Sequence, residues 1–192
     1  MNLKRAIVSK RQNYIDEYKT AAEKVGAMLK PLSQRQLSWY PSPGVWSVAQ
    51  CISHLIVSGN EYKYQIEEAI KKASQERFVR EDPLRYSLVG KLFINMIEPP
   101  VKRKIKTQKF LDPAIINQKN RLIEEFSEIN EELISAVQSS ENLDISRIKV
   151  VLPVSKLLRF KLTDAFAFIA AHERRHIWQA ENVIKSEGFP KA

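Results

Sequence analysis

The sequence predicts an all-α protein, a four-helix bundle with a helical insertion between the second and third long helices. Composition favours this class, because only 5 glycines occur against 9 prolines and Glu, Lys, Leu and Ala are abundant. Four long stretches also carry apolar residues at intervals of three and four, so each helix has one apolar stripe to bury against the others. No repeat or linker divides the chain, and we therefore expect a single domain over residues 1–192.

The first helix is expected from about residue 8 to residue 30, close to Pro31. Its stripe recurs at the spacing of an amphipathic helix: Ile7, Tyr14, Tyr18, Ala21, Val25, Met28 and Leu32. A loop containing LSWYPSPGV should follow. Ser47 and Gln50 then form a Ser-x-x-Gln capping box, so the second helix should begin there and continue to about Ser74.

Two Asp-Pro pairs mark further helix starts, because Asp caps a helix and Pro fits its first turn. The pair at 82–83 predicts a short apolar helix that is closed by the prolines at 99–100. The pair at 112–113 predicts the start of the third long helix, which has its own apolar stripe: Ile115, Leu122, Phe126, Ile129, Leu133 and Ala136.

The last quarter of the chain combines an irregular segment with a helix. Residues 141–161 are expected to be irregular or briefly extended, with VVLPV at the centre. Thr163 should introduce the fourth long helix. Gly188, followed by Phe189 and Pro190, predicts a left-handed cap at which that helix stops.

The net charge of +9 raises the question of nucleic acid, because clustered Lys and Arg bind phosphate backbones. The densest basic cluster spans residues 102–109, and a smaller one lies at residues 4–11. Neither is interleaved with aromatic residues, and no helix-turn-helix, zinc-finger or RNP-type motif accompanies them. We attribute the charge to solvated side chains and do not expect a nucleic-acid partner.

One cysteine, Cys51, rules out an internal disulfide framework. It is expected to be a small buried hydrophobe, as a free cysteine usually is. No run approaches the roughly 18 to 20 apolar residues that cross a bilayer, and the amino terminus lacks the apolar core of a secretory signal. We therefore expect no membrane partner and a cytoplasmic location.

Histidine is the informative residue type, because the chain has only 3, at positions 54, 172 and 176. In HERRH the last two are four apart, which places both imidazoles on one helix face, one turn apart. A divalent cation can be bound by such a pair. Glu173 falls near the same face, which points inward, whereas three neighbours are expected to point away: Arg174, Arg175 and Trp178.

Two other interpretations of HERRH remain open. The string matches the zincin pattern H-E-x-x-H, in which the glutamate is the general base, although no further ligand motif follows it. The two histidines could equally be a hydrogen-bonded pair in the core. Periodicity does not place His54 with the others, since it lies away from the apolar stripe of its helix, although VAQCISHLIV is apolar nearly all round.

The chain resembles the DinB-like superfamily, which includes bacillithiol and mycothiol S-transferases and metal-dependent hydrolases. The resembling features are Trp46-Ser47 at the start of the second helix, His54-Leu55, and His172-x-x-x-His176-x-x-Gln179 on the fourth. The resemblance spans essentially the whole chain, including the number and order of the helices. It implies that His54, His172 and His176 are metal ligands, with zinc or nickel as the ion and a fourth position open.

The resemblance further implies a transferase that uses a low-molecular-weight thiol as co-substrate, and a homodimer. The alternatives are a metal-dependent hydrolase, in which Glu173 is the available general base, and a non-catalytic metal-binding or stress-related protein. Gln179 is a candidate to support a ligating histidine. The thiol would need a basic rim, for which the cluster at 102–109 or Arg85 is available.

Overall fold

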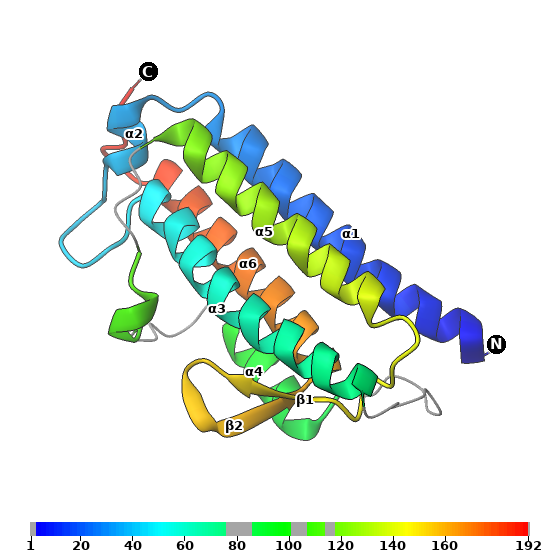
Figure 1. Ribbon diagram of the computed structural model, residues 1–192. Coiled ribbons are helices and arrows are strands. Elements are labelled where there is room, and N and C mark those ends of the chain that lie inside the picture. Colours follow the sequence, from blue (N-terminus) through cyan, green and yellow to red (C-terminus); the bar gives the residue numbers. More distant parts are fainter. Residues whose placement is uncertain (1–2, 76–85, 101–106, 114–117, 192) are drawn as a thin grey trace.

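The chain folds as a bundle of long helices, which confirms the all-α class (Figure 1). The computed structural model describes residues 3–75, 86–100, 107–113 and 118–191. The long helices are α1 (Leu3–Leu29), α3 (Val48–Gln75), α5 (Lys119–Ser139) and α6 (Leu162–Ile184). Both α1 and α3 pack against α5 and α6, so α1 and α3 lie diagonally across the bundle.

The apolar stripes of the four long helices form the core. Large side chains that are fully buried come from each of them: Tyr18, Leu29, Ile52, Ile66, Leu122, Phe126, Leu133 and Phe166. Burial of each such side chain contributes roughly 1.5–3 kcal/mol. The helix α1 begins at Leu3 rather than near residue 8, because no glycine or proline interrupts the preceding residues.

Two capping boxes organise the chain between α1 and α3. The predicted box is confirmed, since the Gln50 N–H donates to Ser47 Oγ at 3.2 Å and the Ser47 N–H donates to Gln50 Oε1 at 2.9 Å. A second box, Ser33 with Gln36, starts the short helix α2 (Gln34–Ser38), which falls in the segment expected to be a loop. The same Ser-x-x-Gln signal is therefore present at both positions.

The insertion contains α4 (Leu88–Ile97) and a 3-10 turn, η1 (Lys109–Leu111). The start expected at 82–83 lies outside the described residues, and Ser87 is instead the N-cap of α4. Its hydroxyl accepts a hydrogen bond from the Gly90 N–H at 2.9 Å. Gly90 itself lies so close to α6 that an added Cβ would be 2.3 Å from Asp164 Cγ, so only glycine fits there.

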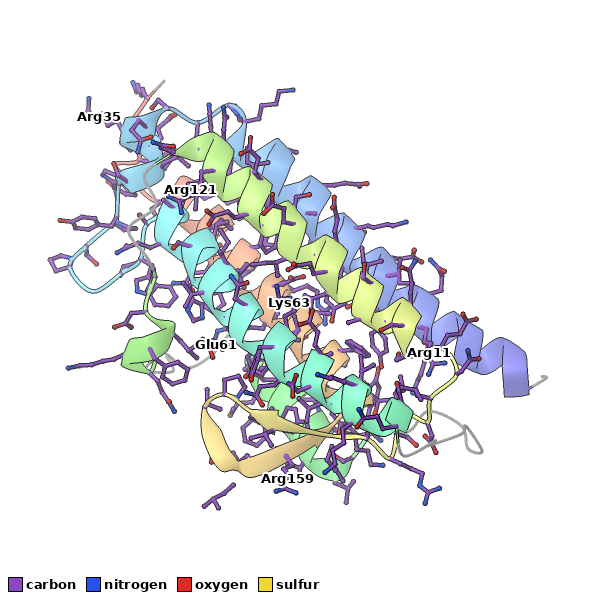
Figure 2. The ribbon with its side chains drawn as sticks, viewed as in Figure 1. Arg11, Arg35, Glu61, Lys63, Arg121 and Arg159 are labelled. Atoms are coloured by element: carbon purple, nitrogen blue, oxygen red, sulfur yellow. The ribbon has the colours of Figure 1, made fainter. Side chains whose placement is uncertain are left out.

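The start of α5 also differs from the expectation. Asp112 ends η1, and Gln118 is still extended, so α5 begins at Lys119 rather than at 112–113. At the other end of α5, Arg11 donates hydrogen bonds to the carbonyls of Ser140, Glu141 and Leu143, each at 2.9 Å. These bonds join α1 to the end of α5, where Arg11 is seen in Figure 2.

The segment expected to be irregular or briefly extended is an antiparallel hairpin of β1 (Lys149–Leu152) and β2 (Ser155–Lys161). Val150 faces Phe160 across it, and both side chains are buried. The helix α6 follows directly, with Lys161 as its N-cap rather than Thr163.

At its other end, α6 stops at Ile184, four residues before the predicted Gly188, although Gly188 does adopt the left-handed conformation (φ 80°). The closing turn brings Phe189 against Trp39 beside α2. None of the helices in the described ranges is long and apolar enough to cross a membrane.

Candidate metal centre

The three histidines meet between α3 and α6. His54 Nε2 lies 3.2 Å from His172 Nε2, and one ring nitrogen of each histidine lies within 4.8 Å of the others. The imidazoles of His54 and His176 are buried, whereas His172 is partly exposed. The structure therefore brings together the residues that the resemblance implies as ligands, and His172 is the least buried of the three.

Each helix positions its histidines differently. On α6 the four-residue spacing places His172 and His176 on the face that packs against α3. His54 lies off the main apolar stripe of α3, yet three consecutive residues there, Ser53, His54 and Leu55, are all buried. This stretch is enclosed on more than one side because α3 contacts α5, α6 and η1.

Hydrogen bonds from Nδ1 fix the orientation of two of the three imidazoles, those of His54 and His176. His54 Nδ1 lies 2.7 Å from the carbonyl oxygen of Leu111, and His176 Nδ1 lies 3.0 Å from Gln179 Oε1. A carbonyl oxygen can only accept, so each Nδ1 carries the proton and donates. This tautomer leaves the Nε2 lone pair of both rings free to bind a cation. The role of Leu111 has no sequence signal, because η1 reaches α3 only through the tertiary fold.

Aromatic rings surround the histidines. Trp46 packs against His54 and His176, with ring centroids 4.8 and 5.6 Å apart, and Phe168 stacks parallel to His172 at 6.0 Å. Trp46 stands just before the Ser47 cap of α3, the pair that the resemblance marks, and this position brings its ring against His54 and His176.

Burial is the main cause that lowers the pKa of all three histidines. The pKa falls furthest for His172 and His176, where the neighbouring histidines add to the effect. All three are therefore neutral at neutral pH, which is the form that binds metal ions. Two nitrogens bound to zinc at about 2.0–2.1 Å with a tetrahedral angle lie about 3.3 Å apart. The 3.2 Å separation of His54 and His172 fits this geometry.

Glu173 follows His172 but turns toward another part of the bundle. Its carboxyl group is hydrogen-bonded to the Asn130 side chain of α5, and burial raises its pKa well above the usual range. One of its oxygens, Oε2, has no hydrogen-bond partner among the described residues. One residue along a helix rotates the side chain by about 100°, which separates Glu173 from the bonds that orient the histidines.

The two arginines of HERRH point in different directions. Arg174 forms ion pairs with Glu98 at 2.7 Å and with Glu17, away from the histidines as predicted. Arg175 does not point fully into solvent as predicted, because its side chain is half-buried and its Nη1 is fully buried. Its positive charge is one of the lesser causes that lower the pKa of the three histidines. Since it follows His172 by three residues, the i, i+3 relation along a helix already places it beside that histidine.

Two other groups considered from the sequence lie apart from the ligand set. Cys51 is fully buried and burial raises its pKa, as expected of a small core residue. Most of the proposed basic rim, residues 102–106 and Arg85, lies outside the described residues, while Lys109 is exposed on η1.

A cavity of about 470 Å³ lies elsewhere, between the C-terminal half of α3 and the hairpin. Its rim includes Arg147, Lys149 and Arg159, and the last of these is labelled in Figure 2. None of the three histidines lines it, so we do not assign the metal chemistry to this cavity.

Comparison with known proteins agrees with the motifs. Residues 17–180 match the sequence model of the DinB superfamily. The uncharacterized protein YuaE of Bacillus subtilis (strain 168) is 25% identical over 156 residues, which are 81% of this chain and 87% of that protein. No solved structure gives a significant match. The region matched by the family model contains all three histidines, and the resemblance drawn from them is confirmed.

Proposed function

We propose that this protein, which belongs to the DinB superfamily, is a metal-dependent transferase that acts with a low-molecular-weight thiol. The observation that carries the proposal is the convergence of three neutral imidazoles, His54, His172 and His176, at one partly exposed point. Three protein nitrogens with an open position are typical of a catalytic rather than a structural metal site. Zinc or nickel is the ion we propose, since imidazole suits both.

The surrounding residues hold the ligands in place. Leu111 and Gln179 accept the Nδ1 protons of His54 and His176, and so direct the Nε2 lone pairs to a common point. Trp46 and Phe168 exclude water from the sides of the rings. A divalent ion held there lowers the pKa of a bound thiol and so supplies a thiolate at neutral pH.

The transfer itself needs little from other side chains. The sulfur forms a bond to an electrophilic carbon while the leaving group departs with its bonding electrons, and the thiol proton passes to solvent. Thiol and electrophile would enter beside His172, since it is the least buried of the three histidines. No protein base is required once the thiol is ionised.

A hydrolase is the alternative, and it would need Glu173 as the general base. A general base must be ionised and within hydrogen-bond reach of the attacking water. Glu173 is buried, its pKa is raised, and its described hydrogen bond runs to Asn130. These properties favour the transferase.

We also propose that the protein is a homodimer in the cytoplasm. Apolar side chains are exposed on α4 and the neighbouring β2, and Leu88, Leu92 and Leu157 are 85%, 67% and 93% exposed. A second copy would cover such a surface. A reducing cytoplasm would supply the thiol in its reduced form.

Metal content tests the proposal directly. Elemental mass spectrometry of untagged protein, purified without chelator, should find about one zinc or nickel per chain, and His54→Ala should lose it while circular dichroism shows unchanged helicity. Cys51→Ala is a matched control on the same helix and should retain the metal. Protein that takes up no metal on reconstitution would exclude the proposal. Metal uptake without conversion of any thiol and electrophile pair would instead support the non-catalytic alternative.

A further inference from the structure

Arg175 is a cation beside the histidines that lacks a complete set of partners. It lies one turn after His172 on α6, and its side chain is partly buried. Its terminal nitrogen Nη1 is buried and has no hydrogen-bond partner among the described residues. A buried N–H of a charged group without an acceptor is costly, so such a group is normally paired.

The preceding arginine shows what a paired guanidinium looks like in this protein. Arg174 donates to both carboxylate oxygens of Glu98, at 2.7 and 3.0 Å, and also to Glu17. Both arginines lie on the same helix and have similar exposure. The two arginines differ in their partners. Carboxylates from α4 and α1 meet Arg174 on its side of α6. No acceptor among the described residues meets Nη1 of Arg175.

The position of Arg175 suggests which ligand would satisfy it. Three neutral imidazoles contribute no negative charge, so an ion bound to them keeps its full charge beside the guanidinium. The positive charge of the ion and that of the guanidinium both favour an anionic ligand. An arginine fork is also the side chain best suited to a carboxylate, because it can donate two parallel hydrogen bonds.

We infer that Arg175 binds a carboxylate of the thiol substrate and that the protein therefore selects thiols that carry a carboxylate close to the sulfur. The inference rests on the proposed function, since it places the sulfur at the open position of the three-histidine site. Arg175 is then a specificity-determining residue, and the basic rim expected for the thiol is at least partly supplied from α6 itself.

The test uses cobalt-loaded protein and two small probes of nearly equal size, mercaptoacetate and its neutral amide. Thiolate binding to cobalt is followed by absorption, and the dissociation constants are checked by calorimetry. The variant is Arg175→Gln, with Arg175→Lys as the conservative change. Arg174→Gln is the matched control, because it removes the adjacent arginine that faces the other way.

Arg175→Gln should take up cobalt like the unmodified protein. Its dissociation constant for mercaptoacetate should rise about tenfold or more, whereas that for the neutral amide should change less than about twofold. Arg175→Lys should recover part of the loss, and Arg174→Gln should behave like the unmodified protein. Three results would overturn this inference but not the proposed function. In Arg175→Gln these are equal weakening of the binding of both thiols, unchanged binding of mercaptoacetate, or loss of cobalt. An unmodified protein that binds no cobalt would overturn the proposed function and this inference with it.

Discussion

Two buried polar clusters lie on α6, and they differ in how completely their atoms are paired. At the start of the helix the Asp164 carboxylate is fully buried and accepts hydrogen bonds from the Ser87 N–H, the Ser87 hydroxyl and the Lys161 N–H, at 2.9, 2.6 and 3.3 Å. About two turns further on, His54 and His172 direct Nε2 atoms toward each other, and Arg175 has a buried N–H without an acceptor.

The difference separates a structural cluster from a binding site. Asp164 joins α4 to α6, and its partners are all supplied by the fold, so nothing further is needed there. Within the described part of the chain, Leu111 and Gln179 orient His54 and His176, and Nε2 of His54 lies 3.2 Å from Nε2 of His172. Two imidazole nitrogens that face each other in this way can share a cation, which the paired Asp164 cluster cannot take up. Substitutions in the two clusters should therefore affect different measurements.

The largest effect is expected on metal binding when a ligand is removed. Excess zinc should raise the melting temperature of the unmodified protein, because an ion at 100 times its dissociation constant stabilises the folded state by about 2.7 kcal/mol. His176→Ala should abolish this shift, since loss of a ligand costs more than the roughly 100-fold caused by loss of a supporting group. Differential scanning calorimetry measures it. An equal zinc shift in His176→Ala would place the ion elsewhere.

Asp164→Ala should have the opposite pattern. It leaves buried donors without an acceptor and should lower the free energy of unfolding by about 3 kcal/mol, measured by urea denaturation. The zinc-induced shift should remain. Asp16→Ala, an exposed carboxylate on α1, is the control and should stay within about 0.5 kcal/mol. If Asp164→Ala were as stable as the control, the hydrogen-bonded cluster would not be what joins α4 to α6.

Gln179→Leu should give an intermediate effect confined to the site. His176 would lose the acceptor that orients its ring, and zinc affinity should fall about tenfold, as is typical for groups that support a metal ligand. Competition against a chromophoric chelator measures the affinity. Gln138→Leu on the exposed face of α5 should bind zinc like the unmodified protein. An unchanged affinity in Gln179→Leu would show that His176 needs no partner.

Glu173→Gln should change the free energy of unfolding least, with almost no change at low pH and a larger change as pH rises. Burial raises the Glu173 pKa in the folded state above its unfolded value of 4.5, so the stability linked to its proton is present below pH 4.5 and is lost as pH rises through the folded pKa. Glutamine mimics the protonated group and avoids this loss. The variant should therefore gain stability relative to the unmodified protein above pH 4.5, measured by urea denaturation.

The histidine pKa values are shifted in the opposite direction, so the histidines and Glu173 change stability in different pH ranges. Their folded pKa values lie below the unfolded value of 6.5, so their contribution is present above pH 6.5 and is lost as pH falls toward the folded pKa. Glu173→Gln should leave that acidic loss unchanged. A stability difference between Glu173→Gln and the unmodified protein that does not change with pH would contradict a raised Glu173 pKa. If Glu173→Gln lost activity and showed no such pH-dependent gain in stability, the hydrolase alternative would be restored.

Local signals in the sequence were sufficient for much of the fold. The Ser47 box starts α3 as predicted, and the stripe residues Tyr18, Phe126 and Leu133 are core residues. The Asp-Pro signals were less informative. Asp112 ends η1, and α5 begins at Lys119 after Gln118, which makes no side-chain cap hydrogen bond. Ser87 is the N-cap of α4 because its hydroxyl reaches the Gly90 N–H, and the pair at 82–83 lies outside the described residues.

By itself the sequence determined the helical class and the common face of His172 and His176, because a helix repeats every 3.6 residues whatever surrounds it. Only the tertiary structure decided the burial of His54, the bond from its Nδ1 to Leu111, the turn of Glu173 toward Asn130 and the burial of Arg175 Nη1 away from any described acceptor. Each depends on which elements lie next to a given side of a helix. Periodicity describes the helix alone, whereas burial, charge and hydrogen-bond partners come from its neighbours.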